Sequence, residues 1–225
     1  MSTAAFVRPS GLARWAALGG VAYVVLFILG VIVLDSGQPD FDAPPAEVIS
    51  YWSDGDNRDQ AALGWGLIVL GVFFFLWFLG ALRELMRRVD ADGLLTTLAM
   101  VGGSVYAALT LTGAGLQAGI LTMSDDTYRD QVFPALIHAA RDAGYVLHTS
   151  GGAGAAALII GASLAFRRAG LVPGWIAVAG VIIGILAIGS IFFIPMILIA
   201  IWFVVASFLL FRAASGPRET LPGPD

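Results

Sequence analysis

The chain has 225 residues, of which 58% are hydrophobic and only 12% are charged, and its formal net charge is −4. A soluble domain of this length does not need so much apolar surface, so the composition excludes a soluble globular protein and predicts one that lies in a membrane. Cysteine is absent, which excludes disulfides, thiol catalysis and thiolate metal sites.

Six apolar runs follow along the chain, each long enough to cross a bilayer, which takes roughly 20 apolar residues. The runs cover residues 15–34, 61–82, 94–121, 143–166, 174–189 and 195–211. The first run does not end in an Ala-x-Ala cleavage site, so we expect it to remain as the first helix rather than to be a cleaved signal. The sequence therefore predicts an all-α polytopic membrane protein, a six-transmembrane-helix bundle that forms one domain over residues 1–225.

The basic residues are distributed unevenly around these runs. Nine arginines fall on one side of the membrane, namely Arg8, Arg14, Arg83, Arg87, Arg88, Arg167, Arg168, Arg212 and Arg218. Three fall on the other side, namely Arg58, Arg129 and Arg141. Because positive charge stays on the cytoplasmic side, we expect both termini in the cytoplasm. The use of arginine for every basic residue is typical of a GC-rich bacterial genome, so the expected location is the bacterial plasma membrane.

The longest polar stretch, residues 35–59, lies on the outer side between the first two runs. Its segment 44–47 (Pro-Pro-Ala-Glu) is typical of a helix start, and residues 48–52 are mostly apolar and aromatic. We predict a short outer amphipathic helix here, with its aromatic side on the bundle or on the outer membrane interface. Asp54-Gly55 is expected to end it, and residues 56–59 are expected to cap the second transmembrane helix.

The outer side also carries eleven of the sixteen acidic residues, including a short acidic loop expected at 124–130. The fourth helix is expected to begin before the membrane, with an amphipathic lead-in at 132–140. An anionic outer face disfavours nucleic acid, so the lipid bilayer is the expected partner. On the inner side, residues 83–88 are expected to continue the second helix into the headgroup region, where arginines meet anionic lipid.

The last apolar block, residues 174–211, would be about 57 Å long as one helix, whereas the hydrocarbon layer is about 30 Å thick. Gly189, Ser190 and Pro195 are the available helix breakers. We therefore expect a tight hairpin whose tip is the apolar stretch 191–194. A re-entrant segment is the alternative, but it would place Arg212 outside, against the charge rule.

Polar side chains form one stripe on each of two consecutive helices. On the third helix the stripe is Tyr106, Thr110, Gly113 and Gln117. On the fourth helix it is His138, Arg141, Asp142, Tyr145, His148 and Thr149. Gln117 and His148 are expected at a similar depth near the outer hydrocarbon boundary, where polar groups turn toward the bundle or water. The two stripes are therefore expected to face each other.

Three interpretations of these stripes remain open. The first is structural, with hydrogen bonds between helices worth roughly 0.6 kcal/mol each. The second is a cavity that opens to the outside and is covered by the 48–52 helix. Its predicted lining is Tyr106, Thr110, Gln117, Asp142, Tyr145 and His148. The third is an ion or proton relay.

The polar residues of the two stripes give weak support for catalysis or cofactor binding. His138 and Asp142 are four residues apart on one helix face and can share a metal ion, but no third ligand is evident. Both histidines lie on one helix, whereas bis-histidine haem needs imidazoles on facing sides. Ser150 lies on a different helical face from His148, so it lacks an adjacent base. We therefore expect no cofactor, no metal and no enzymatic activity, and a third ligand beside His138 and Asp142 would favour a membrane hydrolase instead.

Two glycine pairs, Gly115-x-x-x-Gly119 and Gly180-x-x-x-Gly184, have the spacing that lets helices approach closely. Packing inside the bundle is the first interpretation of both pairs. A homodimer interface is the second, so a homo-oligomer is a possible partner state.

Four apolar and aromatic segments stand out beyond the spans themselves. They are residues 46–52 (AEVISYW), 75–83 (FLWFLGALR), 171–175 (LVPGW) and 192–195 (FFIP), the last leading to Trp202. In these segments, and over nearly its whole length, the chain resembles a group of uncharacterised bacterial multi-pass membrane proteins that share a domain of unknown function. Pro44 departs from the family pattern, in which a Ser or Asp often caps the outer helix. The resemblance implies a six-helix bundle and brings no activity, substrate or cofactor.

Together these features favour a non-enzymatic membrane protein that binds a lipid or small amphiphile, or acts as an accessory protein. The alternative is a small-solute or ion transporter that works as a homo-oligomer. A buried, paired charge near the membrane midplane would favour transport, and the sequence places none there.

Overall fold

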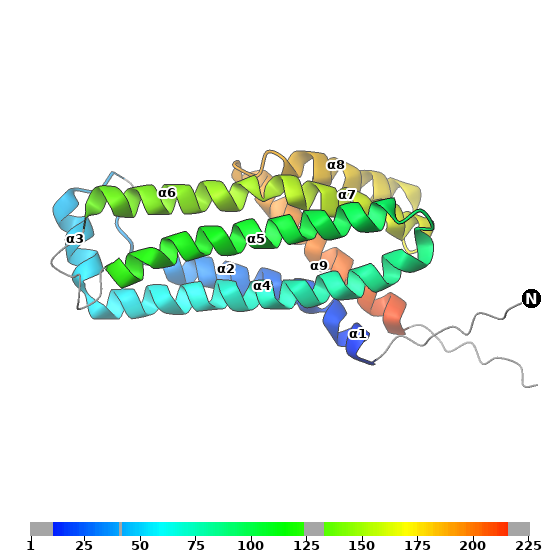
Figure 1. Ribbon diagram of the computed structural model, residues 1–225, viewed down its shortest axis with the longest axis horizontal. Coiled ribbons are helices and arrows are strands. Elements are labelled where there is room, and N and C mark those ends of the chain that lie inside the picture. The colour runs from blue at the N-terminus through cyan, green and yellow to red at the C-terminus, as the bar shows by residue number, and fades with distance from the viewer. Residues whose placement is uncertain (1–10, 41, 124–132, 216–225) are drawn as a thin grey trace, which may run out of the picture.

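The computed structural model describes residues 11–40, 42–123 and 133–215, and these residues form α-helices and turns without a β-strand (Figure 1). The helices are α1 (Gly11–Ala17), α2 (Gly19–Asp35), α3 (Pro45–Ser53), α4 (Gly55–Val89), α5 (Leu94–Met123), α6 (Pro134–Ser150), α7 (Gly152–Arg168), α8 (Gly174–Ala187) and α9 (Phe193–Ser215). The predicted all-α fold is confirmed. The predicted outer loop at 124–130, together with Arg8, Arg129 and Arg218, lies outside the described residues.

Four helical stretches within the described chain are long and apolar enough to cross a membrane. They are Gly55–Val89, Leu94–Thr122, Pro134–Arg168 and Phe193–Ala214, the third being α6 and α7 together. The apolar helices α2 and α8 have only 17 and 14 residues. At about 1.5 Å per residue α8 is about 21 Å long, which is less than the hydrocarbon thickness of about 30 Å. Each predicted apolar run is helical over most of its length, but the six-span count is not confirmed.

The first predicted run consists of two helices rather than one. α1 ends at Ala17, and the Leu18 N–H donates to the Trp15 carbonyl at 3.0 Å in a tight turn before α2 begins. After this turn the start of α2 packs directly against the backbone of α4. A Cβ on Gly19 would collide with the Phe74 carbonyl oxygen of α4, so the position requires glycine. Apolar composition continues through this turn, so the sequence pattern does not reveal it.

The long helices and the C-terminal pair occupy different parts of the molecule. α4, α5 and the α6–α7 rod run along the whole long axis, whereas α8 and the oblique α9 lie beside only part of it (Figure 1). The main core contains the buried side chains Phe75, Phe78, Ile159 and Phe203. α4, α5 and α6 continue beyond the α8–α9 turn, and α3 lies across their far end (Figure 1).

The predicted outer helix is α3, and its apolar side lies on the bundle. Val48 and Trp52 are each 2% exposed, and they pack with Ala61, Ile120 and Ile137 in a second core. We call this set the outer cluster. It joins α3 to the ends of α4, α5 and α6.

The cap of α4 differs from the prediction. The Asp54 carboxylate accepts a hydrogen bond from the Asp56 N–H at 2.9 Å, so Asp54 is the N-cap. The expectation that residues 56–59 cap this helix is wrong, because α4 begins at Gly55 and these residues are already helical.

The last apolar block is interrupted between α8 and α9. Ser190 Oγ donates to the Thr149 carbonyl at 2.5 Å, and the Tyr145 hydroxyl donates to the Ile191 carbonyl at 2.7 Å. These bonds tie the turn to α6. Pro195 lies in the first turn of α9, where its missing N–H costs no helical hydrogen bond, so the turn is 188–192 rather than the predicted tip 191–194.

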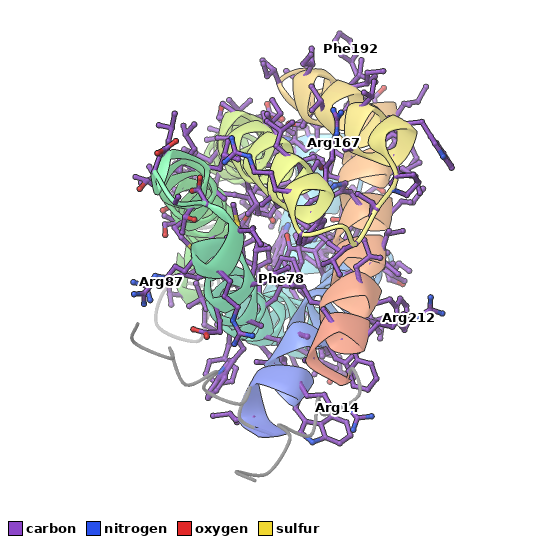
Figure 2. All side chains as sticks on the ribbon, turned by 90° about the vertical axis from the view of Figure 1, so that its right-hand side faces the viewer. Arg14, Phe78, Arg87, Arg167, Phe192 and Arg212 are labelled. Carbon is purple, nitrogen blue, oxygen red and sulfur yellow. The ribbon has the colours of Figure 1, made fainter. Side chains whose placement is uncertain are left out.

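The two ends of the described chain lie at the same end of the bundle (Figure 1). The rings of Trp15 and Phe211 are 6.5 Å apart, and the Arg14 guanidinium carbon lies 4.5 Å from the centre of the Phe211 ring. Figure 2 shows Arg14, Arg87, Arg167 and Arg212 around this end. The arginine-rich segments assigned to one side by sequence therefore gather at one end of the fold.

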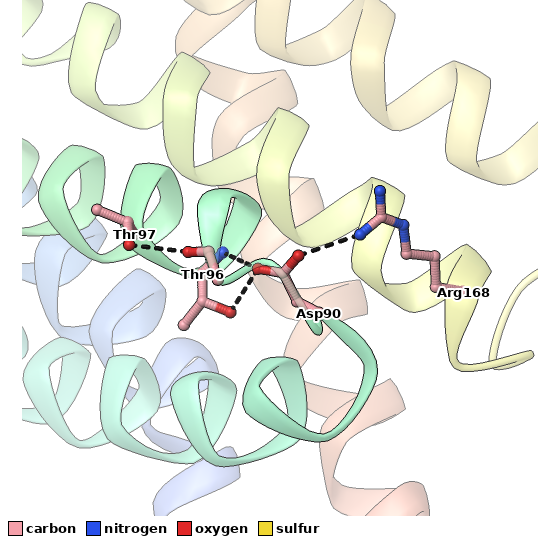
Figure 3. A network of polar contacts seen from close by, with 5 residues as sticks. Asp90, Thr96, Thr97 and Arg168 are labelled. Carbon is pink, nitrogen blue, oxygen red and sulfur yellow. Dashed lines mark hydrogen bonds and ion pairs between the residues drawn. The ribbon is translucent and has the colours of Figure 1, made fainter.

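Asp90 connects the α4–α5 turn to α7 at this arginine-rich end (Figure 3). One carboxylate oxygen accepts hydrogen bonds from the Thr96 N–H at 2.8 Å and the Thr96 hydroxyl at 2.9 Å. The other accepts from the Arg168 guanidinium at 3.0 Å. The backbone N–H of Thr96, helped by the Thr96 hydroxyl and the Arg168 charge, holds the pKa of Asp90 below its usual value of 3.8.

We expect Asp90→Asn to lower the melting temperature at neutral pH, because the amide cannot pair with Arg168 as a carboxylate does. A carboxyl pKa that is lower in the folded state stabilises the fold above its usual value, 3.8 here, and this stabilisation is lost as the pH falls through the folded-state pKa. The difference between wild type and variant should therefore shrink on acidification. Thermal unfolding in detergent from neutral to acidic pH measures it, with exposed Asp92→Asn as the control from the same turn. Equal effects of the two variants at neutral pH would contradict this role.

Candidate functional site

A cavity of about 520 Å³ lies between α2, α5, α6 and α9. This volume is within the range of small-molecule pockets, about 300–1,000 Å³. Its walls include α2 from Tyr23 to Asp35 and α5 from Tyr106 to Gln117. At about 1.5 Å per residue these stretches are about 18 Å and 17 Å long, or about half of a hydrocarbon layer about 30 Å thick. The cavity is therefore about as deep as one bilayer leaflet.

The structure places five of the six residues predicted from sequence along this cavity, namely Tyr106, Thr110, Gln117, Tyr145 and His148. The sixth, Asp142, is exposed and does not contribute to the lining. On a helix with about 100° between successive residues, Asp142 points about 110° away from the face formed by Gly144, Tyr145 and His148. The sequence spacing placed Asp142 on the polar stripe of the fourth helix. That stripe covers a wider part of the helix surface than the part that lines the cavity.

The two polar stripes meet where the backbones of α5 and α6 come into contact. A Cβ on Gly113 would stand 2.5 Å from the Gly144 carbonyl oxygen, so these glycines allow the two backbones to touch. Thr110 Oγ1 and His148 Nδ1 are 3.1 Å apart, in hydrogen-bond contact. Backbone contact between the glycines thus brings the polar side chains of both helices to one wall of the cavity.

The deep end of the cavity is aromatic, with its hydroxyl groups paired. The Tyr23 and Tyr106 hydroxyl oxygens are 2.7 Å apart. The Phe203 ring centre lies 5.8 Å from that of Tyr23 and 5.7 Å from that of Tyr106. Phe27 stacks on His148 with ring centres 4.9 Å apart and an angle of 24° between planes. This cluster closes the cavity toward the middle of the bundle.

We expect Tyr23→Phe and Tyr106→Phe each to lower the free energy of unfolding, because each leaves the remaining hydroxyl without its buried partner, at a cost of about 1–3 kcal/mol. The double variant should lose less than the sum of the two single losses. A double-mutant cycle from unfolding titrations in detergent should give a coupling energy of about 1 kcal/mol, within the range measured for membrane helices. Strict additivity would show that the two hydroxyl groups do not stabilise each other.

The rim of the cavity is apolar where α2 and α9 border it. On α2, Ile28 is 47% exposed and Ile32 is 59% exposed. On α9, Phe193 is 73% exposed and Ile197 is 43% exposed. Such side chains on the outside of a membrane bundle contact lipid tails. The rim on this side of the cavity is therefore suited to apolar molecules.

Sequence reasoning did not identify the walls contributed by α2 and α9. Both helices are almost uniformly apolar, so periodicity does not distinguish a cavity face from a lipid face. Tyr23 is the one polar aromatic residue on α2, and a single aromatic residue is compatible with either a membrane-interface or a core position. The helix α3, expected to cover the cavity, contributes none of its described lining residues and packs on the outer cluster instead.

Among the described residues, no group of three or more His, Asp and Glu side chains is placed to hold a metal ion. His138 and Asp142 are thus not joined by a third such ligand in this part of the chain. Comparison of the sequence and structure with family models, curated proteins and solved structures found no match. The family resemblance therefore stays a prediction.

Proposed function

We propose that this protein is a non-enzymatic membrane protein that binds a lipid or small amphiphile in the cavity between α2, α5, α6 and α9. The observation that carries the proposal is the contrast between the walls. α2 and α9 supply an apolar, exposed rim, while α5 and α6 supply Tyr106, Thr110, Gln117 and His148. An amphiphile satisfies both surfaces, because its tail contacts the apolar rim and its polar head reaches the side-chain amide of Gln117.

A small-solute or ion transporter acting as a homo-oligomer remains the second candidate. Transport needs a route that continues past the binding site. The route inward from this cavity meets the packed rings of Tyr23, Phe75, Tyr106 and Phe203. We therefore favour binding over transport.

We propose that the arginine-rich end lies in the cytoplasm and the α3 end faces outward across a bacterial plasma membrane. The start of α1 and the end of α9 lie at one end of the bundle (Figure 1), and the labelled arginines gather there (Figure 2). Both observations support this orientation. Reporter fusions at both chain ends should be active in the cytoplasm only, and a reporter in the α3 region should be active outside only. Reporters at the two chain ends on opposite sides would exclude an even number of crossings.

The binding proposal predicts a molecule that co-purifies and depends on cavity volume. Val31 lines the cavity, whereas Val25 on the same helix is 49% exposed and outside the lining. Val31→Trp should fill the cavity and lower the amount of co-purified amphiphile about tenfold, a loss that corresponds to about 1.4 kcal/mol of binding free energy. Val25→Trp should leave it unchanged.

Quantitative lipid mass spectrometry of the two purified variants and wild type measures this effect. Equal amounts of the same molecules in all three preparations would contradict binding in this cavity. Thermal unfolding of each variant controls for loss of the folded bundle, since Val31→Trp is informative when its melting temperature matches that of Val25→Trp.

A further inference from the structure

Resting on this binding function, we propose that the ligand has an amine head and an apolar chain, with its head at Asp35 and its chain directed toward Tyr23. The cavity connects these two residues, which lie at opposite ends of its α2 wall. An amine-headed amphiphile matches the difference in chemistry between these ends.

The first step concerns depth. Asp35 is the last residue of α2, and the polar residues Ser36, Gly37 and Gln38 follow it. Tyr23 lies twelve positions earlier, which is about 18 Å deeper along the helix. A charged head is stable only near the aqueous boundary, because charge is costly in hydrocarbon. The head therefore belongs at Asp35 and the chain at the deep end.

The second step concerns charge. Among the described residues that line the cavity, Asp35 is the one Asp, Glu or Arg. An ionised carboxylate accepts hydrogen bonds and donates none, so it complements an ammonium group and repels a carboxylate or phosphate. The positive charge of Arg141 acts on Asp35 from outside the cavity, because Arg141 is not a lining residue, and one of its guanidinium N–H groups donates to the Pro39 carbonyl at 2.9 Å.

The third step concerns the other polar groups. The hydroxyl groups of Tyr23 and Tyr106 pair with each other, and Thr110 pairs with His148. The deep polar groups are therefore satisfied without a ligand and present no charge partner for a head. Gln117, on the cavity wall toward the outer end of α5, offers a side-chain amide that can bind an amine or hydroxyl.

The test compares three amphiphiles of equal chain length, namely dodecylamine, dodecanol and dodecanoate. The full-length protein is held in an uncharged detergent near neutral pH, and bound ligand is counted by native mass spectrometry over a concentration series. We expect dodecylamine to bind about tenfold more tightly than dodecanol, as a charge-assisted hydrogen bond implies, and dodecanoate to bind more weakly than dodecanol. Equal binding of dodecylamine and dodecanol to the wild type would overturn the head-group assignment.

Variants separate this inference from the proposed function. Asp35→Asn should lower dodecylamine binding to the level of dodecanol, whereas Asp35→Glu should keep the preference. Asp142→Asn is the matched control, because Asp142 is an exposed outer carboxylate that does not line the cavity. A preference that persists in Asp35→Asn, or that Asp142→Asn removes equally, would overturn the role of Asp35.

The cavity-filling variant Val31→Trp completes the set. If it lowers binding of all three amphiphiles while wild type shows no head-group preference, the cavity binds amphiphiles and only the amine inference fails. If wild type binds none of the three, or Val31→Trp binds all three as wild type does, the proposed function fails with it.

Discussion

Replacing Trp52 with alanine is expected to lower the free energy of unfolding by about 3–5 kcal/mol, the usual cost of removing a buried Trp side chain. Trp52 is 2% exposed and belongs to the outer cluster, where it packs with residues of α4, α5 and α6. Its loss leaves a void that the facing helices fill only in part. Unfolding titrations of the purified protein in detergent measure the change.

Ile49→Ala is the matched control, because Ile49 is on the same helix and is 40% exposed. We expect this change to cost less than about 1 kcal/mol, as surface changes usually do. If the two variants lose similar stability, α3 does not derive its position from the outer cluster. The Trp52 side chain would then lie at the membrane interface, the other position considered from the sequence.

Gly102→Leu is expected to lower the free energy of unfolding by about 3 kcal/mol, the upper range for overpacked cores. α5 and α7 touch at Gly102 and Gly154: a Cβ on Gly102 would stand 2.5 Å from the Gly154 carbonyl oxygen and 2.8 Å from the Ala157 Cβ. The third nearest atom is the Leu158 backbone nitrogen at 2.9 Å, so all three are backbone or Cβ atoms that cannot rotate away. The helices must therefore separate to admit the leucine side chain.

The control is Gly115→Leu on the same helix, where an added Cβ meets nothing within 4 Å. Both changes remove a helical glycine and add the same side chain, so helix propensity cancels between them. Gly115→Leu should be neutral or stabilising, since leucine favours helix by about 1 kcal/mol over glycine. A loss of stability at Gly115 as large as at Gly102 would indicate that Gly115 packs against another surface in the membrane.

The glycine pairs illustrate what spacing can and cannot predict. Gly180 and Gly184 are used inside the bundle, where they face Ser163 and Ile160 of α7. Gly115 and Gly119 have the same spacing, yet an added Cβ at either meets nothing within 4 Å. Small residues permit helices to approach closely, but the glycine spacing does not predict which helix packs against them.

Helix ends show a related difference. The outer segment 35–59 was expected to hold a short helix, and α3 lies within it. The fourth helix was expected to begin in a lead-in at 132–140, and α6 begins at Pro134. The packing of Ala61 and Ile120 with this lead-in and with α3 was not expected, because these two residues resemble ordinary residues of a span. Hydropathy measures transfer into an apolar environment and does not distinguish lipid from a protein core outside the membrane.

Sequence alone determined that this chain is helical, with helices long and apolar enough to cross a membrane, and predicted that the stripes of Thr110, Gln117 and His148 face each other. Apolar run length and helical periodicity are local properties, so the sequence reveals them. Only the tertiary structure decided that α2 and α9 complete the cavity, that Asp35 lies at its rim and that Asp142 does not line it. Helices that are apolar on all sides carry no signal for the direction they face. Their orientation follows from close contacts between helices distant in sequence, such as Gly113 with Gly144 and Tyr23 with Tyr106.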